Sequence, residues 1–368
     1  MVSKIIIFVF HILLCLEFRL TKGQTRIKAG YWYSGSNFPV ANINSALFTH
    51  LICAFAPVNS TSYQLSLSAS DEEHFSNFTN TVKKKNPSVT TLLSIGGGGA
   101  NYSTFSSMVS NSSYRKSFID SSIKLSRLYG FQGLDLSWVS ASTSTDMSNM
   151  GVLFEEWKGA IDLESRNSSQ TRLFLTAAVP YSPNLDSTRY PIDYMQHYLN
   201  WVHVLAYDFH TPTRLNFTGA HAALYDPSST SNADYGIGTW INGGLSANKI
   251  VLSLPFYGYA WTLVNPANNS IGAPASGPAI TNGGDMSFKD IKDYISTSGA
   301  KVMYNATYVV NYCSTGTSWI GFDDVEVVKI KVSYAKKSNL LGYCVWQVSH
   351  DDNWVLSQAA ASWIWILY

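Results

Sequence analysis

The sequence predicts an α/β protein with the (β/α)8 TIM-barrel architecture, and two features carry this prediction. Eight short runs are apolar almost throughout, as expected of parallel strands that are covered on both faces. Segments with apolar residues at helical spacing lie between these runs, and eight strand–helix repeats favour a closed barrel. The predicted strands are 29–33, 50–55, 91–95, 133–139, 174–179, 202–207, 250–255 and 341–346.

Helices are expected at four apolar stripes. Ser70 and Glu73 form a capping box before the first stripe. The second stripe ends at Gly130, a typical residue at the end of a helix. Two more stripes cover 150–161 and 325–335. We interpret all four as helix faces that pack on the barrel.

One interval between a predicted strand and the next helix is too long for the regular alternation of strands and helices. About 75 residues separate the strand at 250–255 from the helix near Asp324, too many for one βα unit. The segment 257–320 is rich in Gly, Asn, Pro and Tyr, so it predicts a small inserted domain. Barrel enzymes carry their sites at the C-terminal ends of the strands. The insertion would therefore form one wall of a cleft at the barrel mouth.

Composition excludes some classes of protein. The 368 residues are 46% hydrophobic, 14% aromatic and only 13% charged, which is unlike a disordered chain. The formal net charge is +1, so nothing favours a polyanionic partner. We therefore expect no nucleic-acid binding.

Residues 1–24 have the features of a secretory signal peptide, which leaves 25–368 as the mature chain. Lys4 precedes an apolar run over 5–16, and small and polar residues follow near a cleavage point at Gly23 or Gln24. A signal anchor is the alternative, but this run is short of the roughly 20 residues that span a bilayer. We expect secretion and no membrane attachment after cleavage.

Eight Asn-X-Ser/Thr sequons agree with secretion, and each is a candidate glycosylation site if it is exposed. They start at Asn59, Asn77, Asn101, Asn111, Asn167, Asn216, Asn268 and Asn305.

Three cysteines remain after signal removal, namely Cys53, Cys313 and Cys344. An odd number allows at most one disulfide within the chain and leaves its pairing open. No Cys/His spacing is typical of a metal site, so we expect neither metal nor cofactor.

The most informative segment is 130–139. Asp135 lies in an apolar predicted strand, where a carboxylate is costly to bury unless it is hydrogen-bonded. Residues two apart in a strand share a face, so Asp135, Ser137 and Val139 are expected to point together. This pattern indicates a functional site, and the alternative is a structural Asp held by neighbouring groups.

Several short segments follow one another along the mature chain, and they include Gly30-Tyr-Trp, Cys53-Ala-Phe-Ala, Leu92-Leu-Ser-Ile-Gly-Gly, Ala206-Tyr-Asp-Phe, Tyr257-Gly-Tyr-Ala-Trp and Gly342-Tyr-Cys-Val-Trp. In this order they resemble the plant class V chitinases of glycoside hydrolase family 18. The resemblance implies the (β/α)8 barrel with an α+β insertion after strand seven, and secretion to the apoplast or vacuole.

The family's catalytic signature, Asp-X-X-Asp-X-Asp-X-Glu, is degenerate here. Its four positions hold Gln132, Asp135, Ser137 and Val139, and Ser140 replaces the Tyr that follows in plant relatives. In the family the final Glu is the general acid, and the Asp before it orients the N-acetyl group that attacks the anomeric carbon, an exception to the two-carboxylate scheme. Val donates no proton, so hydrolysis is predicted to be lost, and restoring the signature residues is predicted to restore it.

The sugar cleft itself is expected to persist. By resemblance, Tyr31, Phe55, Tyr207 and Trp346 line it, and Asp135, Tyr207 and Asp208 offer hydrogen bonds. Core packing is the alternative role for each aromatic side chain. The sequence thus predicts a secreted, lectin-like protein that binds N-acetylglucosamine oligomers (chitin oligosaccharides) or N-glycans.

Two other functions stay open. One is an active hydrolase of chitin or a lipo-chitooligosaccharide, in which Asp208 would have to replace the missing acid. The other is an inhibitor or storage protein that binds a protein partner through its loops or insertion. The oligomeric state is not predicted.

Overall fold

The computed structural model describes residues 26–139, 141–185 and 188–362, so the predicted signal peptide and Ser140 lie outside the described residues. Eight strands form a closed parallel barrel in the order β1-β16-β9-β8-β5-β4-β3-β2. This confirms the predicted architecture. The barrel strands are β1 (Ile27–Tyr33), β2 (His50–Ala56), β3 (Thr90–Gly96), β4 (Gly133–Ser137), β5 (Phe174–Pro180), β8 (Trp201–Leu205), β9 (Ile250–Pro255) and β16 (Gly342–Trp346).

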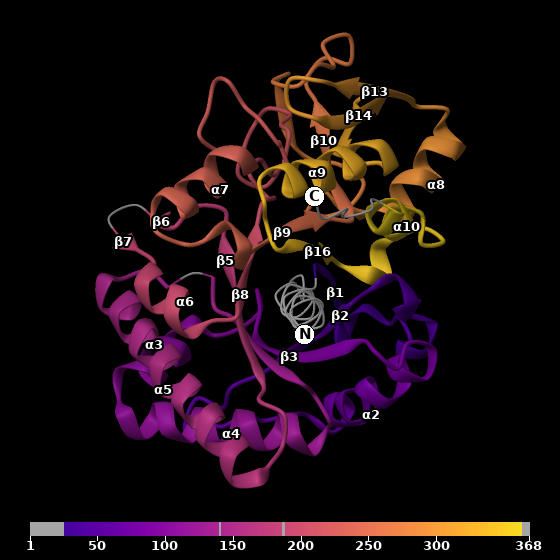
Figure 1. The fold of residues 1–368 in the computed structure, drawn as a ribbon. Coiled ribbons are helices and arrows are strands. Elements are labelled where there is room, and N and C mark those ends of the chain that lie inside the picture. The colour runs from indigo at the N-terminus through magenta and orange to yellow at the C-terminus, as the bar shows by residue number, and fades with distance from the viewer. Residues whose placement is uncertain (1–25, 140, 186–187, 363–368) are drawn as a thin grey trace, which may run out of the picture. The chain divides into compact units, whose positions relative to one another are not determined.

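Helices lie outside the barrel strands (Figure 1). A two-stranded hairpin, β6 (Asn184–Leu185) with β7 (Thr188–Arg189), precedes α6. The helices around the barrel are α2 (Ala69–Lys85), α3 (Tyr102–Ser110), α4 (Ser112–Leu128), α5 (Ser144–Ser168), α6 (Ile192–Tyr198), α7 (Ala233–Asn242), α9 (Val325–Lys337) and α10 (Val355–Ser362).

Two local expectations were wrong. The N-cap of α2 is Ser68 rather than Ser70, because the Ser68 hydroxyl accepts the backbone N–H of Asp71. Strand β4 ends at Ser137, so Val139 lies in the turn that follows it. Helix α4 ends just before Gly130 as predicted, and Gly130 lies in the left-handed region at φ 71°.

The segment after β9 forms the predicted α+β insertion. Its antiparallel sheet has the order β11-β10-β15-β14-β13, and β12 pairs with β10. Trp261 and Trp319 pack edge to face at 5.3 Å in the core of this sheet. The elements are β10 (Tyr257–Leu263), β11 (Ala275–Pro278), β12 (Asp285–Ser287), α8 (Phe288–Ser298), β13 (Lys301–Asn305), β14 (Val310–Thr315) and β15 (Ser318–Phe322).

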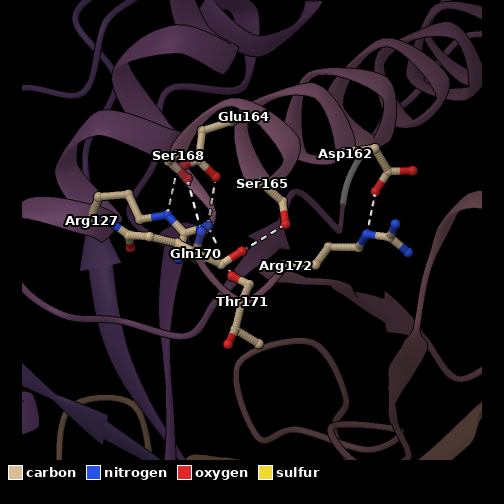
Figure 2. Close-up of polar contacts among 8 residues, drawn as sticks. All are labelled: Arg127, Asp162, Glu164, Ser165, Ser168, Gln170, Thr171 and Arg172. Carbon is tan, nitrogen blue, oxygen red and sulfur yellow. Dashed lines mark hydrogen bonds and ion pairs between the residues drawn. The ribbon is translucent and has the colours of Figure 1, made fainter.

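Helices α4 and α5 are joined by a bidentate ion pair at the C-terminal end of α5 (Figure 2). Arg127 donates Nε to Glu164 Oε1 at 3.0 Å and Nη2 to Oε2 at 2.5 Å, and Nη2 also donates to the Thr171 carbonyl at 2.9 Å. The hydrogen bonds from Arg127 lower the pKa of Glu164. Arg172 adds an ion pair to Asp162 at 2.8 Å. The Arg127–Glu164 pair thus fixes α4 against α5, and Arg172 ties the loop after α5 to that helix.

All three cysteines are free and buried, so the described chain uses none of them in a disulfide. Burial raises the pKa of each thiol, which makes them poor nucleophiles. Over the described ranges, no cluster of His, Cys, Asp and Glu has the arrangement of a metal site, and no helix is long and apolar enough to cross a membrane.

Candidate functional site

The carboxylate of Asp135 is the polar centre of the barrel, with no exposed surface. The strand register places Ser94 of β3 and Thr176 of β5 directly beside it. Asp135 Oδ2 accepts the Tyr31 hydroxyl at 2.8 Å and the Ser94 hydroxyl at 2.7 Å, while Oδ1 accepts the Thr176 hydroxyl at 2.7 Å. The two neighbouring strands, β3 and β5, and the more distant β1 therefore each give this carboxylate one donor, which offsets its desolvation.

His203 lies beside Asp135 without neutralising it. His203 Nε2 accepts the Trp201 indole N–H at 3.1 Å, so this nitrogen carries no proton, and Nε2 is 3.8 Å from Asp135 Oδ1. Burial lowers the pKa of His203 and raises that of Tyr31, and the Asp135 charge adds to the rise for Tyr31. The imidazole is thus neutral, and Tyr31 stays protonated as a donor.

This geometry corrects the ligand contact expected of Asp135. The side chain has no exposed surface, and both oxygens accept hydrogen bonds from barrel hydroxyls. Asp135 holds Tyr31 in place under the mouth instead of facing it.

We expect Asp135→Ala to lower the free energy of unfolding by about 3 kcal/mol, because three buried hydroxyl donors lose their acceptor. Asp135→Asn retains one acceptor oxygen and should lose less. Urea unfolding followed by circular dichroism measures both. Equal stability of Asp135→Ala and the wild type would contradict the assigned role.

The other signature positions lie at opposite ends of β4. Ser137 ends the strand, nearly buried, and Val139 is half-buried in the turn beyond it. Gln132 precedes the first residue of β4, at the N-terminal end of the barrel, where its Oε1 accepts the Thr91 N–H at 3.0 Å. Gln132 is therefore a structural residue away from the mouth. The turn after β4 thus carries the aliphatic Val139 at the position where the family resemblance implies a general acid.

Aromatic rings gather at the C-terminal ends of β1, β2 and β16. Phe55 and Trp346, both half-buried, stack with centroids 5.6 Å apart and an interplanar angle of 20°. Tyr31 packs 5.5 Å from Trp346, and Tyr33, 39% exposed, lies 6.2 Å from Phe55 and 6.4 Å from Trp346. Sequence reasoning missed Tyr33, although it follows Tyr31 by two residues and so lies on the same face of β1.

Asp208 anchors a second group at the mouth, on the loop after β8. Its Oδ1 accepts hydroxyls from Tyr257 at 2.5 Å and Tyr259 at 3.1 Å, both on β10 of the insertion. Arg214 donates to the Asp208 carbonyl at 2.6 Å, and Tyr207 packs 5.9 Å from Tyr257. Burial raises the pKa of Asp208, and the two hydroxyls oppose this rise. The insertion therefore contributes directly to the site.

The tyrosines and arginine around Asp208 were not among the predicted site residues. Tyr257 and Tyr259 begin the insertion, and nothing in their local pattern indicates that they reach back to a loop about fifty residues earlier. Arg214 lies in a loop without periodicity. Only the closure of the fold brings these groups together.

A buried histidine, His221, is expected to make the folded protein less stable at acidic pH. Burial lowers the pKa of His221 from 6.5 to about 3. Below pH 6.5 the unfolded chain protonates this histidine while the folded chain does not, so the contribution to stability is lost as the pH falls from about 6.5 towards 3. Between pH 7 and pH 4, wild type should lose about 3 kcal/mol more than a His221→Asn variant. Urea unfolding at both pH values tests this, and equal losses would contradict it.

Most of the candidate glycosylation sites are accessible. Seven of the sequon asparagines are exposed, and Asn305 is half-buried. The Oδ1 atoms of Asn101 and Asn111 cap helices, which leaves the Nδ2 atoms that carry a glycan free of this role. Occupancy stays a prediction.

Comparisons with known proteins identify the family of the chain. The family model for glycosyl hydrolases family 18 matches residues 27–351. A class V chitinase of Arabidopsis thaliana is 47% identical over 360 residues, which cover 98% of this chain and 95% of the relative. The two sequences are therefore similar along nearly their whole length.

Solved structures show the same fold. A mutant class V chitinase from Nicotiana tobaccum in complex with NAG4 is 44% identical, with a TM-score of 0.91 over 93% of this chain and all of that one. The chitinase-like agglutinin RobpsCRA from Robinia pseudoacacia is 43% identical, with a TM-score of 0.86 over 91% of this chain and 99% of that one. The chain belongs to glycosyl hydrolase family 18.

Proposed function

We propose that this protein is a secreted, lectin-like member of its family that binds N-acetylglucosamine oligomers at the barrel mouth and does not cleave them. The observation that carries the proposal is the aliphatic Val139 in the turn after β4, at a mouth that also holds an aromatic wall of Tyr33, Phe55 and Trp346. An aliphatic side chain transfers no proton, whereas general acid–base assistance is typically worth about 10²–10⁴-fold.

The aromatic wall supports sugar binding. Pyranose rings present C–H groups that pack on aromatic faces, and the half-buried Phe55–Trp346 stack offers such a surface. Tyr207 and Asp208 supply polar groups for hydroxyl or N-acetyl groups. The tobacco relative crystallised with NAG4 supports this ligand class, and the chitinase-like agglutinin supports a binding role. N-glycans, which contain N-acetylglucosamine, are the second ligand class.

Calorimetry with chitotetraose, and a glycan array for N-glycans, test the proposal. We expect saturable binding at or below millimolar concentration. Absence of binding to every chitin oligomer and N-glycan at that concentration would remove the proposal. A protein partner captured from cell-wall extract regardless of added sugar would favour the inhibitor or storage function instead.

Hydrolysis is the second candidate function, because Asp208 could supply the missing acid. It is a carboxyl group at the same mouth, and burial raises its pKa towards the range of a general acid. Its oxygen is already engaged by Tyr257 and Tyr259, which argues for a positioning role. Turnover of a chromogenic chitooligosaccharide that Asp208→Asn abolishes would establish an active hydrolase.

A further inference from the structure

A pocket lies on the outer flank of the barrel, between α5, α6 and the end of α7, and its lining includes none of the mouth residues described above. Its volume is about 670 Å³, within the roughly 300–1,000 Å³ range of small-molecule sites. One wall is a face of α5 that includes Met147 and Ser148. The other wall runs from Arg189 of β7 to Tyr194 of α6, and Gly243 after α7 closes one end.

Tyr194 is held as a flat platform at this pocket. A Cβ atom on Gly151 of α5 would come within 2.8–3.1 Å of three atoms of the Tyr194 ring, so the ring lies against the glycine backbone. The side chain remains 36% exposed and lines the pocket. Gly151 thus supports one side of the Tyr194 ring, Tyr198 lies 6.0 Å from it, and the exposed part of the ring is available to a ligand.

Charged groups of both signs flank the ring. The exposed Asp193 carboxylate has no ion-pair or hydrogen-bond partner within the described part of the chain. Arg189 is also exposed, and its Nη2 is fixed on the Gly243 carbonyl at 3.2 Å. A carboxylate accepts from hydroxyls and a guanidinium donates to them.

This combination fits a sugar better than an apolar ligand. A pyranose has one face of C–H groups for the Tyr194 ring and hydroxyls at its edge for Asp193 and Arg189. An apolar ligand would bury the Asp193 carboxylate without a hydrogen-bond donor, and burying an unpaired charge costs free energy. We propose that this pocket is a second saccharide site that binds chitin oligosaccharides, an inference that rests on the proposed lectin-like function.

Two sites on one chain have a functional consequence. A protein with one site per molecule coats a polysaccharide, whereas a protein with two sites links separate polysaccharide chains even as a monomer. The protein should therefore cross-link soluble chitin polymers into larger particles.

Calorimetric stoichiometry with chitotetraose tests the second site. Wild type should bind two molecules per chain. Tyr194→Ala and Asp193→Asn should each weaken the flank site at least tenfold and leave about one molecule bound, while Trp346→Ala should remove the mouth site and leave the other one. Tyr235→Ala, at an exposed tyrosine of α7 outside the pocket, is the matched control and should bind two.

The outcomes separate the two proposals. One bound molecule in the wild type, lost in Trp346→Ala and kept in Tyr194→Ala, would overturn the flank site and leave the mouth site standing. One bound molecule that only the Tyr194 and Asp193 variants remove would support the flank site and overturn the mouth site. Light scattering with soluble chitin polymer should rise with wild type and the control, and stay flat with Tyr194→Ala; a rise with Tyr194→Ala would contradict the linking role.

Discussion

The double variant Ser137→Asp with Val139→Glu should hydrolyse chitin oligosaccharides at least about 100-fold faster than the wild type. Glu at 139 would place a proton donor in the half-buried turn after β4. Asp at 137 would lie on the same face of β4 as the buried Asp135, where a second carboxylate raises the pKa of one member of the pair. Together they would restore an acid and a group that orients an N-acetyl substituent.

The structure also simplifies this design. The full reversion expected from the sequence includes Gln132→Asp, but Gln132 bonds to the Thr91 backbone at the far end of the barrel. A shorter side chain there would lose this bond without adding chemistry at the mouth, so Gln132 is left in place.

Rates of product release from chitotetraose measure the effect. The matched control is Ser137→Asn with Val139→Gln, which has nearly the same shape and no carboxyl group, and it should stay at the wild-type level. If the acidic double variant folds, binds chitotetraose and shows no turnover, the loss of hydrolysis does not lie in these two positions.

Trp346→Ala should weaken chitotetraose binding at the mouth at least about 30-fold, corresponding to about 2 kcal/mol. Trp346 stacks on Phe55 and packs against Tyr31 and Tyr33, so it is the centre of the aromatic wall. Removing the indole deletes the largest surface that a sugar ring would cover and leaves its neighbours without their packing partner.

Calorimetry on Trp346→Ala and on a Tyr304→Ala control measures this loss. Tyr304 is 51% exposed on β13 of the insertion, so its removal should leave affinity unchanged. Circular dichroism shows whether each variant is folded. Unchanged affinity in a folded Trp346→Ala variant would remove the aromatic wall from the binding site.

The barrel architecture could be predicted because short stretches of sequence indicate each strand and helix. Apolar runs such as 50–55 mark strands buried on both faces, and helical spacing marks the helices between them. Element ends were less predictable. The strand predicted over 133–139 ends at Ser137, and the sequence does not show this because an apolar Trp138 and Val139 are compatible with a strand and with the turn after it.

Within the candidate site, the sequence located side chains without giving their partners. Asp135 was correctly identified as a buried carboxylate in a strand, but its hydrogen-bond donors are Tyr31, Ser94 and Thr176 from three other strands. Likewise Asp208 was recognised, whereas its contact with Tyr257 depends on the insertion folding back. Such long-range partners are set by barrel closure and not by local pattern.

The most direct test is a calorimetric titration of the wild-type protein with chitotetraose, followed by mass spectrometry of the recovered sugar. A saturable isotherm with all of the tetramer intact is the predicted result. Shorter oligomers accumulating in proportion to the amount of active protein, and absent with heat-denatured protein, would show that a proton reaches the glycosidic oxygen by another route and would contradict the account.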